Sequence, residues 1–157
     1  MPKTPNIEWD ERAGPIPNAR RELPPLAAAY FAYVREVLAD RSSPAELHCV
    51  RLATKRLRYT LELFRDCYGP GLEDRLEALR QVQQALGDLN DSVASRELLK
   101  KSMGSPAQGA RVDKFLEQRA RQQARQFRQH WTEVFDAHGR ERWFAGYLRR
   151  PARAPRK

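Results

Sequence analysis

A row of basic side chains in the segment 44–68 has the residue types and the spacing of an anion-binding surface. Its members are His48, Arg51, Lys55, Arg56 and Arg58. At 100° per residue of a helix they fall on one face, with Arg56 at its border and Glu62 as the only acid placed to neutralise them. A repeating anion would relieve the mutual repulsion of these charges, because arginine donates forked hydrogen bonds to phosphate oxygens and lysine adds a point charge. The row therefore predicts polyanion binding, although the same spacing is also typical of the solvated face of an amphipathic helix.

His48 adds a group whose charge follows pH. If it touches phosphate, binding should tighten as the pH falls from about 8 to about 6, because the protonated imidazole is favoured beside an anion. We expect no metal site, since His48 has no second histidine at HxxxH spacing and no cysteine at zinc spacing. The sequence also has no Walker glycine loop, no HExxH and no Gly-x-Ser-x-Gly motif. We therefore expect a protein that is not an enzyme and that uses no cofactor.

The net charge of +9 favours acidic partners but does not choose among nucleic acid, polyphosphate and acidic proteins. Residues 1–110 hold 16 basic and 15 acidic side chains, whereas residues 111–157 hold 13 and 5. This late excess keeps a nucleic-acid-binding function open as an alternative, and a protein-interaction module is a further one. No apolar run has the length of a membrane span, and the N-terminus lacks the apolar core of a signal peptide. We expect a cytoplasmic protein that does not contact membranes.

Helical periodicity and turn residues predict an all-α fold with no strands. Residues 1–25 contain six prolines and are predicted to form an extended arm. A helix is expected over 26–40, and another over 44–68, where Ser43, Pro44 and Glu46 have the order of an N-cap, a first-turn proline and a capping-box acid. The glycines and proline at 69–71 are expected to end that helix.

The second half of the chain is predicted to continue as helices. We expect a helix from Leu72 to a break at Gly87-Asp88, a shorter helix to about Lys101 and a flexible loop over 102–109. A long amphipathic helix over 111–137 should bury an arc that includes Phe115, Trp131 and Val134. A short aromatic helix follows, and residues 149–157 are predicted to be a basic flexible tail.

The stretch 46–99 resembles the conserved histidine α-helical domain, or CHAD domain. The resemblance rests on the run LHCVRLATKRLRYTLELF at 47–64, the run ending in LGDLND at 86–91 and the small residues that follow it. The helix with Trp131 and the pair Trp143-Phe144 are similar to the family's fourth helix and closing aromatics. The resemblance extends over residues 26–148.

The resemblance implies an antiparallel four- to five-helix bundle, half of a CHAD-type domain, that binds inorganic polyphosphate and can localise to polyphosphate granules. Carried onto this chain, it assigns the anion to His48, Arg51, Lys55, Arg56 and Arg58, with Arg119 as a secondary contact. Family members generally contain two such halves, and this chain has one. A symmetric homodimer is the expected way to restore the second half, and a monomer with an open groove is the alternative.

Overall fold

The computed structural model describes residues 5–102 and 106–152, and this part of the chain is helical and contains no strand. In chain order the elements are α1 (Pro15–Ala39), α2 (Pro44–Leu63), the 3₁₀ turn η1 (Arg65–Cys67), α3 (Gly71–Ser102), α4 (Pro106–His130), the π-helical turn η2 (Trp131–Phe135) and α5 (Arg140–Leu148). The predicted all-α bundle is confirmed. None of the described helices is both long and apolar enough to cross a membrane.

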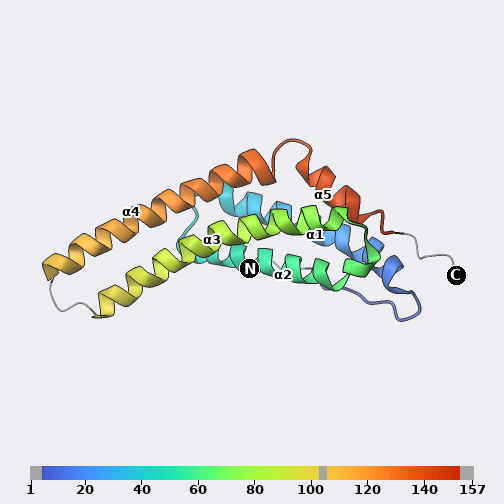
Figure 1. Ribbon diagram of the computed structural model, residues 1–157, viewed down its shortest axis with the longest axis horizontal. Helices are drawn as coiled ribbons and strands as arrows, with labels where there is room; N and C mark the ends of the chain where they lie inside the picture. Colours follow the sequence, from blue (N-terminus) through green and yellow to red (C-terminus); the bar gives the residue numbers. More distant parts are fainter. Residues whose placement is uncertain (1–4, 103–105, 153–157) are drawn as a thin grey trace.

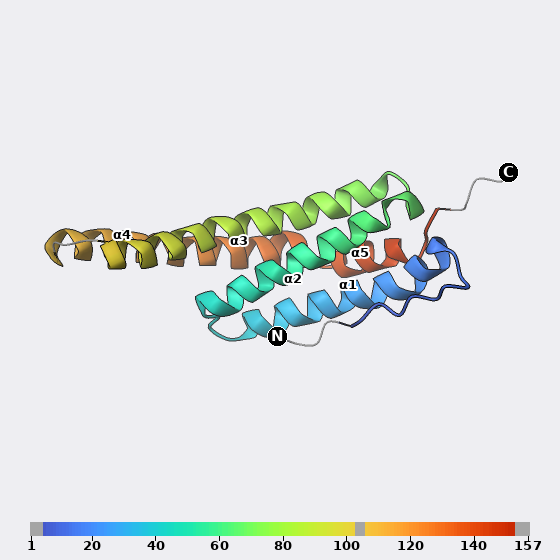
Figure 2. The same cartoon turned by 90° about the horizontal axis from the view of Figure 1, so that it is seen from below.

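Successive long helices run antiparallel, and α3 lies between α2 and α4 (Figures 1 and 2). The hairpin of α3 and α4 continues well beyond the end of the α1–α2 pair, whereas α5 follows α4 toward the opposite end of the molecule and packs against α1. The bundle therefore has a packed end, built from all five helices, and a projecting two-helix end. The outer side of α4 is not covered by another helix at the projecting end.

The helix α1 begins eleven residues earlier than the sequence predicted, so the extended arm ends at Gly14 rather than at residue 25. Asn18 explains the early start. Its buried side chain donates to the carbonyls of Asp10, Ala13 and Gly14, at 3.0, 3.2 and 2.9 Å, and accepts from the backbone of Asp10. The arm is thereby held to the first turn of α1, and the helix continues through Pro24 and Pro25.

The predicted break at Gly87-Asp88 is wrong, because α3 runs through both residues as one helix. Leu86 and Leu89 are buried on either side of them, so burial of this stripe outweighs the low helix propensity of a single glycine. Asp88 does not cap a second helix; it accepts a hydrogen bond from Gln84 at 3.0 Å. Similarly, α2 ends at Leu63 rather than at residue 68, and η1 completes the turn.

The helix predicted over 111–137 is α4 followed by η2, and its buried arc is narrower than expected. Phe115 is 59% exposed and Val134 is 47% exposed. A π-helical turn holds more residues than an α-helical turn, so residues beyond His130 rotate away from the 100° spacing that the prediction assumed. Trp131 and Phe135 still reach the core.

Aromatic side chains close the packed end of the bundle. Phe31 of α1 stacks on Phe135 with ring centroids 5.2 Å apart and meets Phe144 of α5 at 5.8 Å, while Trp131 stacks on Phe135 at 4.6 Å. The C-terminal segment is anchored to this end as far as Ala152, whose N–H donates to the carbonyl of Cys67 at 2.7 Å. Of the predicted tail, residues 149–152 form no helix, and residues 153–157 lie outside the described part.

Candidate functional site

The basic row begins one turn into α2, whose start is fixed by the capping box expected from the sequence. Ser43 Oγ accepts from the N–H of Glu46 at 3.2 Å, and the Glu46 carboxylate accepts from the N–H of Ser43 at 2.7 Å. Leu47, Val50, Leu57 and Leu61 are buried, which sets the rotation of the helix. With that face fixed, the row must lie toward α3 and solvent.

Arg58 is the member of the row that is most firmly tied to α3. Its Nε donates to Oε1 of Gln83 at 2.9 Å, and its Nη1 contacts the carboxylate of Glu62 at 2.6 Å. Glu62 also lies 3.8 Å from the guanidinium of Arg80 on α3. The C-terminal end of the row is thus partly neutralised by one carboxylate that serves two arginines.

Arg51 and Lys55 form the less compensated part of the row. Within the described residues, neither makes an ion pair, and the Arg51 side chain makes no hydrogen bond even though its Nε is buried. The Arg51 side chain lies beside Gly87 of α3. A Cβ added to Gly87 would be 3.8 Å from the Nε of Arg51. Lys55 Nζ lies 5.7 Å from the centroid of the Tyr59 ring. The guanidinium carbon of Arg58 lies 4.5 Å from the same centroid. Arg51 and Lys55 therefore carry positive charge that no carboxylate of the described residues neutralises.

His48 marks the N-terminal end of the row. Its side chain is exposed, and Nδ1 lies 3.1 Å from Oδ1 of Asn90 on α3. The amide oxygen can only accept, so Nδ1 carries a proton in this contact. The other ring nitrogen, Nε2, takes no part in it. No group of three or more His, Cys, Asp or Glu side chains in the described part of the chain is arranged to hold a metal ion.

The structure brings together four of the six residues that the sequence proposed. Arg56 lies on α2 with an exposed side chain, but it is 140° around the helix from Arg51 and does not face α3. Arg119 is exposed on α4, whereas the row lies on α2, and α3 packs against both of these helices. The joined set is therefore His48, Arg51, Lys55 and Arg58.

Sequence reasoning missed most of the α3 side of this site. Gln83, Gly87 and Asn90 follow one another at i, i+4 and i+7, the spacing of one helical stripe, and all three meet the row. Gln83 accepts from Arg58 and so bonds α3 to α2. The predicted break at Gly87-Asp88 hid this continuous stripe, because it placed Gln83 and Asn90 on two different helices.

The chain is similar to one family of helical domains, the CHAD domain family. The model of the CHAD domain matches residues 7–100, which is more than half of the chain and extends from the N-terminal arm into α3. The match contains the whole of α2 and the α3 residues that meet its basic row. The chain matches no curated protein and no solved structure.

Proposed function

The chain belongs to the CHAD family, and from this membership we propose that it binds inorganic polyphosphate along the basic row of α2. The observation that carries the proposal is that Arg51 and Lys55 form no ion pair among the described residues. Both sit on a helix anchored to α3 by Arg58 and Gln83, and neither has a carboxylate partner within the described residues. Positive charge is therefore held in place without an internal counter-ion.

The dimensions of the row suit a repeating anion. Seven residues of helix separate Arg51 from Arg58, which corresponds to roughly 10 Å of helix axis. An extended phosphate chain laid along α2 would meet His48 first, then Arg51 and Lys55, and finally Arg58. Glu62 at the far end would repel it, so we place the strongest contacts at the N-terminal part of the row.

The proposed role is binding without catalysis. The row supplies hydrogen-bond donors and positive charge, and its one bound acid, Glu62, is engaged by Arg58 and Arg80. Such a module would act in the cytoplasm. It would attach to polyphosphate granules and bring with it any protein to which it is linked.

A second copy of the chain is the proposed partner. The outer side of α2 carries an apolar stripe beside the basic row, formed by Leu52, Tyr59 and Leu63, which are 39%, 46% and 85% exposed. In an antiparallel pair of α2 helices, Leu52 of one copy would meet Tyr59 of the other, so the stripe is complementary to itself. The basic rows would then border the same seam, and a shared polyanion would offset their repulsion.

The site is tested by charge reversal in the full chain. Arg51→Glu with Lys55→Glu should abolish retention on immobilised polyphosphate. Arg12→Glu with Arg20→Glu changes the net charge equally at exposed positions on the arm and α1, outside the row, and should leave retention intact. The logarithm of affinity should fall with the logarithm of salt concentration with a slope of about −0.7 for each phosphate charge neutralised. Full retention by the Arg51 and Lys55 variant, with an unchanged helical spectrum, would reject the site.

The dimer has a separate test. The mass in solution should double on addition of polyphosphate, and Leu52→Glu should prevent the doubling while leaving a monomer that still binds. A protein that stays monomeric at saturating polyphosphate would remove the second copy from the proposal but not the α2 site.

A further inference from the structure

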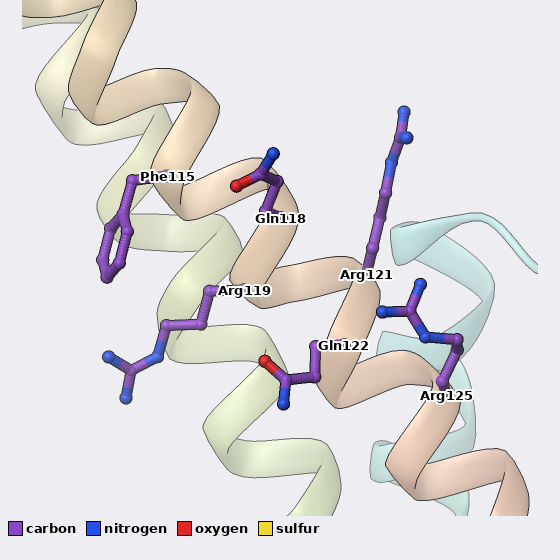
Figure 3. A pocket seen from close by; sticks show the side chains of 6 residues that line it. All are labelled: Phe115, Gln118, Arg119, Arg121, Gln122 and Arg125. Atoms are coloured by element: carbon purple, nitrogen blue, oxygen red, sulfur yellow. The ribbon is translucent and has the colours of Figure 1, made fainter.

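A second cationic surface lies on α4, outside the region matched by the family model and on the far side of α3 from the basic row. It is a shallow hollow in the outer face of the projecting hairpin (Figure 3). The side chains that line it are Phe115, Gln118, Arg119, Arg121, Gln122 and Arg125. All come from one helix, and none of them is acidic.

The arginines of this surface, here called the α4 face, are largely uncompensated. Arg119 and Arg125 make no ion pair or hydrogen bond through their side chains within the described residues, and both are exposed. Arg121 contacts Glu117 at 2.7 Å, and Glu117 does not line the hollow. The α4 face therefore attracts anions independently of the row on α2.

Phe115 distinguishes the α4 face from a simple phosphate site. Its ring is 59% exposed, although burial of a phenylalanine side chain is usually favourable by a few kcal/mol in other proteins. Phe115, Arg119 and Gln122 are spaced i, i+4 and i+7, and Figure 3 shows all three side chains on the same side of α4. An aromatic ring, a guanidinium and an amide thus follow one another along a single accessible stripe.

This combination does not suit polyphosphate, which has no planar or apolar group to place on the ring. It suits a ligand that repeats both a phosphate and an aromatic base. We propose that the α4 face binds single-stranded nucleic acid, with a base stacked on Phe115, the flanking phosphates on Arg119 and Arg125, and the amides of Gln118 and Gln122 toward the base edges. A duplex is excluded from this mode because its bases are stacked on one another and present no face to the ring.

The geometry of the hairpin makes the surface accessible. The α3–α4 pair projects beyond α1 and α2, so a strand can lie along α4 without meeting the packed end of the bundle (Figure 2). From Phe115 to Gln122 the helix axis rises by roughly 10 Å. That length allows contact with two or three successive nucleotides of an extended strand, and a further turn brings in Arg125.

The experiment measures fluorescence anisotropy of a labelled oligouridine and of a labelled oligothymidine with the full-length protein at low salt. Phe115→Ala should weaken binding of both about tenfold, and Phe115→Trp should restore or tighten it, because stacking requires a ring. Arg119→Glu with Arg125→Glu should abolish it. Leu98→Ala, at an equally exposed apolar side chain on α3 (67%), is the matched control and should have no effect.

The second part of the experiment measures polyphosphate binding by the same variants. Phe115→Ala should leave polyphosphate retention unchanged, and the Arg51 and Lys55 reversal should leave oligonucleotide binding within about twofold of the parent. Preference of oligouridine over oligothymidine would identify RNA as the natural source, and the reverse would identify DNA. The proposal is overturned if Phe115→Ala binds both strands as the parent does, if Phe115→Trp fails to restore binding, or if duplex and single strand bind the α4 face equally.

Discussion

Arg58 of α2 donates from Nε to Oε1 of Gln83 on α3 at 2.9 Å, and this contact joins the basic row to the neighbouring helix. The same guanidinium contacts Glu62 at 2.6 Å. Arg58 is thus oriented by two partners of different kinds, a neutral amide across the helix interface and a carboxylate one turn along its own helix. The amide positions the guanidinium without cancelling its charge, whereas the carboxylate does both.

Glu62→Gln should therefore strengthen polyphosphate binding. Among the described residues, the change removes the only carboxylate paired with the joined row, and it keeps a side chain of the same size beside Arg58 and Arg80. A partly exposed pair contributes about 0.2–1 kcal/mol, so affinity should rise about 1.4- to fivefold at low salt. Titration of a labelled polyphosphate measures it, with Glu133→Gln on η2 as a control of equal charge change. An unchanged or weaker affinity would show that the anion does not reach Arg58.

Polyphosphate binding should tighten as the pH falls from about 8 to about 6. The contact of His48 Nδ1 with Asn90 holds the ring beside the row, and a phosphate bound there would favour the protonated imidazole. Affinities measured across the range should rise in the parent protein and stay flatter in His48→Gln, which keeps a polar side chain but cannot be protonated. Parallel profiles for the two proteins would remove His48 from the site.

Gly87→Ala should stabilise the protein. The residue lies inside α3, where alanine is favoured over glycine by roughly 0.5–1 kcal/mol, and the added methyl group would make an ordinary contact with Arg51 at 3.8 Å. The midpoint of urea unfolding should therefore rise. Gly139→Ala is the opposite case, since φ is +81° there and the substitution should lower the midpoint. A destabilised Gly87→Ala would mean that Arg51 needs the bare backbone of α3.

The buried hydrogen bond between Tyr30 and Thr54 should show an asymmetry between its partners. The two hydroxyl oxygens are 2.7 Å apart, and Thr54 Oγ1 already donates to the carbonyl of Val50 at 2.8 Å. Tyr30→Phe removes one bond and should cost about 1 kcal/mol, whereas Thr54→Val strands the buried phenol and should cost about 1–3 kcal/mol. Urea unfolding of the two variants compares them directly, and equal costs would contradict this assignment of donors.

Alkaline pH should lower the stability of the fold through its buried tyrosines. Burial raises the pKa of Tyr30 and the pKa of Tyr68 above the ordinary value of 10.0. Above that pH the unfolded chain releases these protons and the folded chain retains them, so stability is complete below about pH 10 and falls as the pH rises further. Urea midpoints between pH 8 and about 11 should fall less steeply in Tyr30→Phe than in the parent. Identical slopes would mean that Tyr30 ionises normally in the folded protein.

The amino-acid sequence by itself determined the helical class, the start of α2 and the face of α2 that carries the basic row. These features depend on neighbours within about one turn: the capping box at Ser43 and Glu46, and the burial of Val50, Leu57 and Leu61 at helical spacing. Local hydrogen bonds and periodicity are sufficient to specify them.

Only the tertiary structure decided how the row is completed and where helices begin and end. The early start of α1 depends on Asn18 bonding the arm, and the continuity of α3 through Gly87 depends on packing against α2 and α4. The contact of Arg58 with Gln83 spans 25 residues, and the exposure of Phe115 follows from the projection of one hairpin beyond the bundle. Contacts between residues distant in sequence have no local signature, because their energy appears only once the helices have packed.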